Sequence, residues 1–123
     1  MKEIGLNLYS LRTLISDEAG FLDTAIKLRE MGYTFLQYSG GPYDHEMIAR
    51  VSKESGLPVV LTHVPLDRIV SDTEALMEEH AVFGCKNIGL GAMGSSVLLD
   101  EKNCKETIEK LNAAGEKMQK NGF

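Results

Sequence analysis

Apolar and polar positions along this chain follow two periods in turn, one typical of strands and one typical of helices. Residues 4–11 place Ile4, Leu6 and Leu8 on one side and small or polar residues on the other, which predicts a first strand. The next segment has apolar residues at helical spacing and predicts a helix over 21–31. The same succession recurs three times, with strands predicted over 34–39, 57–64 and 87–93, and helices over 46–55, from 71 onward and over 101–119.

Glycines and capping residues mark the ends of these helices. Asp44 precedes the second helix as a good N-cap, and Ser71 with Glu74 has the spacing of a capping box before the third. A glycine just past a helix end takes the left-handed conformation without a Cβ clash. Four glycines stand at such positions, about every 30 residues: Gly32, Gly56, Gly84 and Gly122.

The pattern therefore predicts an α/β protein of four consecutive βα units with a parallel sheet, in a single domain over residues 1–123. Two architectures fit such units: half of a (β/α)8 barrel, or a small doubly wound open sheet. Both faces of a doubly wound sheet should be apolar. Three predicted strands instead have one small or polar face, which favours the half-barrel, truncated before strand five: Gly5, Asn7 and Tyr9; Phe35, Gln37 and Ser39; Gly89 and Gly91.

The composition of the chain argues against several classes of function. The chain has 13 basic and 18 acidic residues and a net charge of −5, without a basic cluster, which argues against binding to nucleic acid. No segment reaches the roughly 20 apolar residues of a membrane span, and the first residues are too polar for a secretory signal. Cys85 and Cys104 have no metal-like spacing, so we expect reduced thiols in a cytoplasmic protein.

Three residues at strand ends are candidates for substrate binding: His63, Gln37 and Tyr9. Ligands of parallel α/β proteins bind at the carboxyl ends of the strands, and His63 ends the third strand, on the same predicted face as Val59 and Leu61. A histidine there can bind metal, move a proton or donate a hydrogen bond. The alternative for all three is a core or rim residue whose polar atoms are satisfied by neighbours.

Other polar features carry weaker signals. The glycine-rich loops 39–43 and 89–96 could present amides to an anion, but they match neither the dinucleotide nor the P-loop motif, and turn chemistry explains them equally well. His45 and His80 are expected on helix surfaces, and the run 77–80 is expected to be a solvated face. Asp67 and Arg68 either line the mouth of the barrel or begin a loop. The sequence shows no complete metal-ligand cluster and identifies no catalytic residue.

The amino-acid sequence around three strand ends resembles that of the sugar phosphate isomerase/epimerase family, which belongs to the xylose-isomerase-like TIM barrels. The stretches that carry the resemblance are 8–12 (LYSLR), 32–37 (GYTFLQ) and 56–63 (GLPVVLTH). The likeness runs along the whole chain, but only over the first half of such a barrel. Gln37 departs from the pattern, because many members have a glutamate there, and residues 90–93 lack the histidine of the related apurinic endonucleases.

The resemblance implies an eight-stranded barrel that isomerises or epimerises a carbohydrate by proton transfer next to a carbonyl. It also implies a divalent metal (Mn, Mg, Co or Zn) whose Glu, Asp, His and Glu ligands come from strands five to eight, outside this segment. His63 matches a third-strand histidine that faces substrate or metal in such enzymes. We therefore expect the N-terminal part of a sugar or sugar-phosphate isomerase or epimerase, inactive by itself. The alternatives are a small non-catalytic binding domain and a half-barrel that closes as a homo-oligomer.

Overall fold

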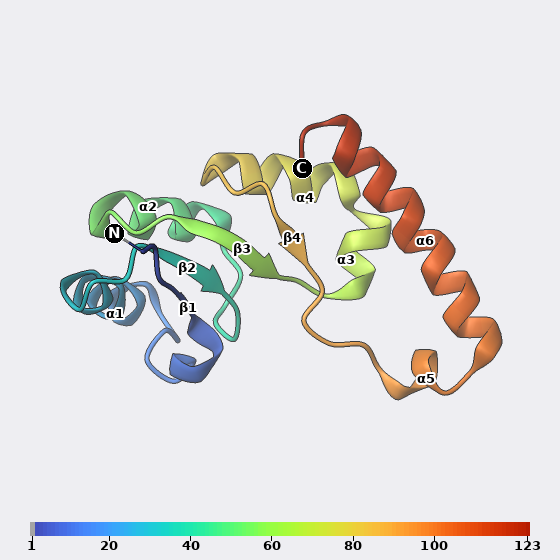
Figure 1. Ribbon diagram of the computed structural model, residues 1–123, viewed down its shortest axis with the longest axis horizontal. Helices are drawn as coiled ribbons and strands as arrows, with labels where there is room; N and C mark the ends of the chain where they lie inside the picture. The colour runs from blue at the N-terminus through green and yellow to red at the C-terminus, as the bar shows by residue number, and fades with distance from the viewer. Residues whose placement is uncertain (1) are drawn as a thin grey trace.

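The computed structural model describes residues 2–123 and shows a parallel four-stranded sheet whose strands alternate with helices (Figure 1). The predicted α/β fold class is confirmed. In chain order the elements are β1 (Gly5–Asn7), the 3-10 helix η1 (Leu8–Leu11), α1 (Glu18–Glu30), β2 (Phe35–Tyr38), α2 (His45–Ser55), β3 (Val59–His63), α3 (Leu66–Ser71), α4 (Thr73–Val82), β4 (Ile88–Gly89), α5 (Ser95–Leu98) and α6 (Glu101–Lys120).

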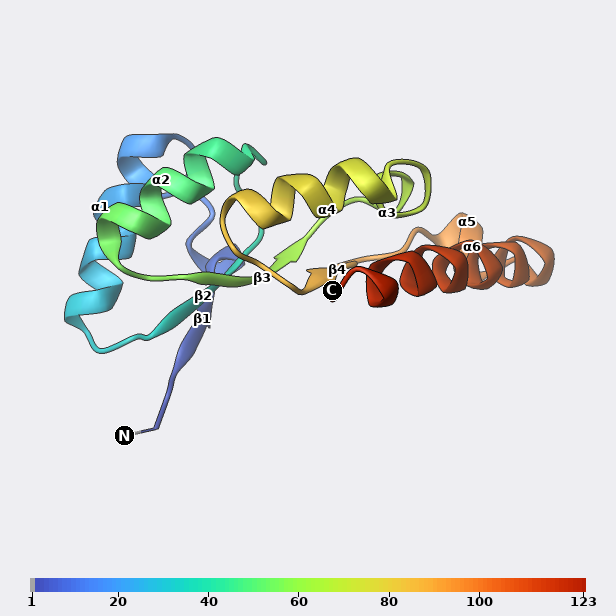
Figure 2. The same ribbon diagram turned by 90° about the horizontal axis from the view of Figure 1, so that it is seen from above.

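The strands lie in the sheet in the order of the sequence, β1-β2-β3-β4, and all three neighbouring pairs are parallel. Figure 2 shows α1, α2 and α4 along the same face of this sheet. A doubly wound sheet reverses its strand order at a switch point and carries helices on both faces. Within residues 2–123 the order does not reverse. The molecule is therefore an open parallel sheet with the strand order of half a barrel.

The sheet has a helix-covered face and an inner face without a helical cover among the described residues. Leu6 pairs with Leu36, which is fully buried under the helices. The alternate residues Gly5 and Phe35 pair on the inner face, where a Cβ on the glycine would overlap the phenylalanine ring. The ring of Phe35 thus lies across a strand that has no side chain to obstruct it. The predicted small or polar face is confirmed for Gly5 and Asn7 of β1 and for Gln37 of β2, whereas Tyr9 and Ser39 lie beyond the ends of these strands.

A register shift between β2 and β3 changes which side chains of β3 reach the inner face. Leu36 pairs with Val59, but the next residue, Gln37, pairs with Leu61 rather than with Val60. One extra residue in a strand reverses the alternation of its side chains. Val59 is therefore buried among the helices, and the prediction that it shares a face with His63 is wrong.

Two apolar clusters fill the space between sheet and helices. The larger joins α1, α2 and the first three strands, and the smaller lies under α3, α4 and α6 around Leu76 and Ala114. From α1 the larger cluster receives Phe21, Ala25 and Leu28. The apolar face of α1 is narrower than predicted, because positions 26 and 31 are exposed. One side of this helix is enough to cover β1 and β2.

The first strand is shorter than its alternating pattern predicts. It ends at Asn7, whose side-chain Oδ1 accepts a hydrogen bond from the backbone N–H of Tyr9 at 2.9 Å. An asparagine that bonds the backbone two residues ahead turns the chain out of the extended conformation. Tyr9 therefore lies in η1 and not at the end of a strand, which corrects the prediction for residues 8–11.

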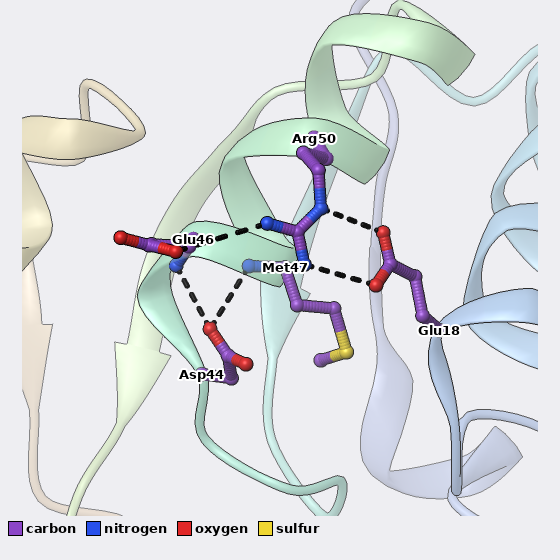
Figure 3. Close-up of polar contacts among 5 residues, drawn as sticks. All are labelled: Glu18, Asp44, Glu46, Met47 and Arg50. Atoms are coloured by element: carbon purple, nitrogen blue, oxygen red, sulfur yellow. Dashed lines mark hydrogen bonds and ion pairs between the residues drawn. The ribbon is translucent and has the colours of Figure 1, made fainter.

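The helix ends follow their capping signals in most places. All four glycines past the helices have left-handed φ values, between 70° and 99°. Asp44 caps α2 as predicted, accepting hydrogen bonds from the N–H groups of Glu46 and Met47, both at 3.0 Å (Figure 3). These bonds, first that from Met47, lower the pKa of Asp44. Asp17 caps α1 in the same way, through the N–H of Gly20 at 2.7 Å, so this helix begins at Glu18, three residues before the predicted start.

An ion pair joins α1 to α2 across their surface. The guanidinium of Arg50 donates to both carboxylate oxygens of Glu18, at 2.8 and 3.0 Å, and lies 3.9 Å from Glu46 (Figure 3). The bond to Arg50 lowers the pKa of Glu18. The pair is exposed to solvent and contributes little to stability, because water and salt screen it.

The predicted capping box at Ser71 and Glu74 is wrong. Ser71 is the last residue of the short helix α3, which the sequence analysis did not predict, and α4 begins at Thr73. The carboxylate of Asp72, between the helices, accepts a hydrogen bond from Arg68 at 3.1 Å and caps no backbone N–H. The hydroxyl of Thr73 donates back to the carbonyl of Ile69 at 2.7 Å. These local bonds continue the chain from α3 directly into α4.

The fourth unit has a two-residue strand and two helices. β4 spans only Ile88–Gly89 of the predicted 87–93, and the unpredicted α5 lies in the loop that follows. The long helix α6 agrees with the predicted 101–119 to within one residue. Its apolar stripe is thin, because Ala114 is buried whereas Ile108 is exposed. No helix in the described part of the chain is both long and apolar enough to cross a bilayer.

Candidate functional site

A cavity of about 590 Å³ lies at the carboxyl ends of the strands, where parallel α/β proteins bind their ligands. All four strands or the loops that follow them contribute to it. β1 and β3 contribute their last residues, and β2 and β4 contribute the residues just after their ends. The lining residues are Asn7, Tyr9, Ser39, Gly40, His63, Val64, Pro65, Gly91 and Ala92.

The structure brings two of the predicted site residues into direct contact. The amide nitrogen of Gln37 lies 2.7 Å from Nε2 of His63 and 3.3 Å from its Nδ1. An amide N–H₂ only donates hydrogen bonds, so Nε2 accepts the shorter one and the proton of the neutral ring lies on Nδ1. The pair spans neighbouring strands on the inner face, and both side chains are half-buried. Gln37 thus orients the imidazole from behind, whereas His63 lines the cavity.

Glycine at position 91 makes room for the imidazole. A Cβ there would lie 2.6 Å from Nδ1 of His63 and 2.9 Å from its Cγ. No real Cβ approaches other atoms so closely, so the ring occupies space that only glycine leaves. Backbone and not a side chain therefore packs against one side of the imidazole, and His63 still lines the cavity.

Tyr9, the third predicted residue, also lines the cavity, but it does so from η1 and is 56% exposed. Its position depends on Asn7, which accepts hydrogen bonds at Oδ1 from the Tyr9 N–H at 2.9 Å and from the hydroxyl of Ser39 at 2.7 Å. Asn7 therefore ties the end of β1 to the loop after β2. Tyr9 lies at the rim of the cavity, where its ring is open to a ligand.

Two residues of this region were not predicted from the sequence, Asn7 as part of the site and Arg12 beside it. Asn7 was assigned to the polar face of the first strand without a role. A polar amide as the last residue of a strand is the signal that could have identified it, because strand ends line the sites of parallel sheets. Arg12 lies over the ring of Tyr9, with Cζ 4.6 Å from the ring centre. The position of Arg12 in the sequence does not indicate this contact, because it is the turn in η1 that brings Arg12 next to Tyr9.

The two glycine-rich loops differ in their contribution. Ser39 and Gly40 from the first loop, and Gly91 and Ala92 from the second, line the cavity. The second loop then leaves the cavity and enters α5 at Ser95.

His80, predicted on the surface, is fully buried, and Met77 beside it is buried too, so the prediction of a solvated face over 77–80 is wrong. Nδ1 of His80 donates to the carbonyl of Leu76 at 2.7 Å, and Nε2 accepts from the hydroxyl of Thr62 at 2.6 Å. Burial lowers the pKa of His80. The imidazole is a structural link between α4 and β3, and it holds the residue directly before His63.

Several polar and charged side chains lie around His80. The hydroxyl of Tyr43 lies 3.2 Å from Nδ1 of His80, and burial, followed by the charge of Glu79, raises the pKa of that tyrosine. Glu79 accepts a hydrogen bond from Arg68 at 2.9 Å, and this bond raises the pKa of the arginine. Arg68 thus lies in α3 and forms an ion pair with Glu79. Neither Arg68 nor Asp67 lines the cavity. His45 begins α2, half-buried and away from the lining.

The lining has hydrogen-bonding groups but no carboxylate, because none of its nine residues is acidic. No group of three or more His, Cys, Asp and Glu side chains in residues 2–123 could hold a metal ion. A single imidazole does not satisfy the several ligands that a divalent metal needs. The described residues therefore do not fit a metal by themselves. They fit the polar oxygens of a small ligand.

Comparison with family models, with curated proteins and with solved structures finds no match for this chain.

Proposed function

We propose that this chain forms the N-terminal half of a divalent-metal-dependent sugar or sugar-phosphate isomerase or epimerase of the xylose-isomerase-like class. The observation that carries the proposal is the bonded pair of Gln37 and His63 at the carboxyl end of a one-sided parallel sheet. The pair lies where barrel enzymes bind substrate, beside a cavity large enough for a small carbohydrate. The resemblance of the strand ends to the sugar phosphate isomerase/epimerase family supports the same class.

In the proposal two residues of this chain, His63 and Tyr9, contact the substrate, and Gln37 positions the first of them. Nδ1 of His63 donates to a substrate oxygen, and Gln37 keeps the ring in that tautomer. Tyr9 contacts the substrate at the rim, where its ring and hydroxyl are exposed. The substrate is a carbohydrate whose hydroxyls suit these uncharged groups.

The proton transfer is assigned to groups outside residues 2–123. Isomerisation next to a carbonyl needs a base within hydrogen-bond reach of the carbon acid, and the cavity has no carboxylate to serve. In the resembling family the metal ligands come from strands five to eight. This chain therefore contributes substrate contacts and no metal ligand. Cys85 and Cys104, both free, support a cytoplasmic location in the same proposal.

The test is to read the gene beyond codon 123 and to assay the polypeptide that it encodes. We expect an open frame that continues into further βα units, and a product that interconverts ketoses with aldoses or with their epimers when Mn²⁺ is added. Replacement of His63 by Ala should lower kcat/KM by about a hundredfold, whereas His45→Ala should leave it unchanged. Isomerase activity of the purified 123-residue chain alone would refute the proposal that it is one half of the enzyme.

The open sheet favours a second candidate, a small binding domain or a half-barrel that closes with a second copy. Among residues 2–123, β1 and β4 each have only one neighbour in the sheet, and the inner face has half-buried side chains such as Phe35 and Leu61. Unpaired edges of this kind invite pairing with another chain. In sedimentation, a tight dimer supports self-closure, a stable monomer supports the binding domain, and aggregation supports the missing half.

A further inference from the structure

Arg12 lies next to Tyr9 of the cavity lining and forms no ion pair within residues 2–123. Nη1 of Arg12 donates to the carbonyl of Tyr9 at 3.0 Å, and its Cζ lies 4.6 Å from the centre of the Tyr9 ring. These two contacts hold the guanidinium beside a side chain that lines the cavity. Arginine has five N–H donors in a fixed fork, so most of them are free for a ligand here.

Gly40 brings the backbone of the next loop against this arginine. A Cβ on Gly40 would lie 2.9 Å from Cβ of Arg12 and 3.0 Å from Cδ2 of Tyr9, and the glycine has a φ of 85°. Side chains are therefore excluded from this position by both contact and conformation. The N–H of Gly40 donates to no backbone carbonyl of the described residues.

Asn7, which lines the cavity, adds two further N–H donors. Its Oδ1 already accepts two hydrogen bonds, from Tyr9 and Ser39, and this fixes which end of the amide is the oxygen. Nδ2 has no hydrogen-bond partner among the described residues. Because Asn7 lines the cavity, these two N–H donors are available to a ligand.

We propose that Asn7, Tyr9, Arg12 and Gly40, called the Arg12 corner below, bind the phosphate group of a phosphate monoester. A phosphate dianion finds a cation and donors from three residues in this corner, and no lining carboxylate repels it. The carbon chain of such a ligand would extend along the cavity to Nδ1 of His63. The inference rests on the proposed function for the reaction, and it specifies that the substrate is phosphorylated and which end of the cavity holds the phosphate.

The test is an NMR titration of the ¹⁵N-labelled 123-residue chain with ribose 5-phosphate, inorganic phosphate and ribose, at constant ionic strength in potassium chloride. We expect saturable shifts of the Gly40 amide, the Asn7 side-chain amide and the Arg12 Nε–H with both phosphates. Ribose 5-phosphate should also shift the ring of His63, and ribose should shift none of these signals at the same concentration. No saturable shift with phosphate, or equal shifts with ribose, would overturn the inference.

Two variants test the residues involved. Arg12→Gln removes the cation and should weaken the binding of ribose 5-phosphate and of inorganic phosphate about tenfold. Asn7→Asp keeps the oxygen that accepts hydrogen bonds from Tyr9 and Ser39 but replaces the free N–H₂ with a negatively charged oxygen. It should therefore weaken the binding of both phosphate ligands at least as much. Lys53→Gln removes an exposed cation at the far end of α2 and is the matched control, with unchanged affinity expected. Wild-type affinity in a folded Asn7→Asp or Arg12→Gln protein would contradict the proposed site.

The binding test and the isomerase assay can give negative results independently of each other. Phosphate binding in the Arg12 corner without isomerase activity of the continuing polypeptide upholds the site and refutes the reaction. Activity on neutral sugars without phosphate binding upholds the reaction and refutes the site.

Discussion

Gly91 lies so close to His63 that a Cβ at position 91 would come within 2.6 Å of Nδ1 of the imidazole. The glycine follows β4 and the histidine ends β3, so the contact joins the ends of two neighbouring strands. The orientation of the candidate substrate-binding histidine is therefore fixed from two sides, by the bond from Gln37 and by the backbone at Gly91.

The first prediction is that Gly91→Ala displaces the ring of His63. The added methyl group meets Cβ, Cγ and Nδ1 of the histidine, so the ring must leave its rotamer at a cost of about 1 kcal/mol. The imidazole ¹⁵N shifts of His63 should change and its bond with Gln37 should break. Gly94→Ala is the control, because a Cβ at Gly94 would meet nothing closer than 3.7 Å. Unchanged His63 shifts in a folded Gly91→Ala protein would contradict the described contact.

The second prediction concerns the hydrogen bond behind the histidine. Gln37→Leu keeps the size of the side chain but leaves Nε2 of His63 without its donor, so the free energy of unfolding should fall by about 1 kcal/mol. The ring should also lose its single tautomer, which long-range ¹H–¹⁵N spectra report. The matched control is Gln119→Leu, at an exposed position near the end of α6. Equal effects of the two substitutions would mean that the Gln37 bond does not form.

The third prediction is a loss of stability in acid caused by His80. Burial holds its pKa below the usual 6.5, so the unfolded chain binds a proton that the folded chain does not. Stability due to this group is therefore fully present above pH 6.5 and declines as the pH falls below that value, with a slope of at most about 1.4 kcal/mol per pH unit. Urea unfolding between pH 5 and pH 7 measures the slope.

The variant for this measurement is His80→Gln, which should have a smaller slope than the wild type. Lys53→Gln, at an exposed position in α2, serves as the control. Tyr43 contacts His80, and the charges of Glu79, Arg68 and His45 also act on its pKa. Variants of these four residues should change the slope less than removal of His80 itself. A wild-type slope in His80→Gln would assign the acid transition to other groups.

The fourth prediction concerns Tyr38 and alkaline pH. Its hydroxyl donates to the carbonyl of Pro42 at 2.6 Å, and burial raises its pKa to about 12. Deprotonation is easier in the unfolded chain, so stability declines as the pH rises above the ordinary value of 10. Tyr38→Phe should reduce this decline and should cost about 1 kcal/mol at neutral pH through the lost bond. Tyr33→Phe is the control, and urea unfolding from pH 8 to pH 11 measures both effects.

Much of the fold could be predicted because its signals are local. Each glycine past a helix had the left-handed φ that its position implied, and Asp44 capped α2 as expected. The alternation of Gly5 with Leu6 and of Phe35 with Leu36 correctly gave the two faces of the first strands. These features depend on residues within one helical turn or one strand, where the sequence and the backbone conformation are directly linked.

The candidate site was predictable in part. His63 and Gln37 were identified by their places at strand ends, but their contact depends on a register shift between β2 and β3 that leaves no mark in either strand alone. Tyr9 reaches the cavity only because the side chain of Asn7 turns the backbone. The same turn places Arg12 over the ring of Tyr9, which no periodic pattern indicates.

The sequence by itself determined the succession of βα units, the four left-handed glycines and the strand ends that have polar side chains. Only the tertiary structure decided which side chains meet: that His80 is buried against Thr62, that Val59 turns towards the helices, and that Gly91 packs on His63. The physical reason is the range of the interactions. Periodicity and capping act over a few residues, whereas strand register and the rotation of α4 against the sheet are set by packing between segments far apart in the chain.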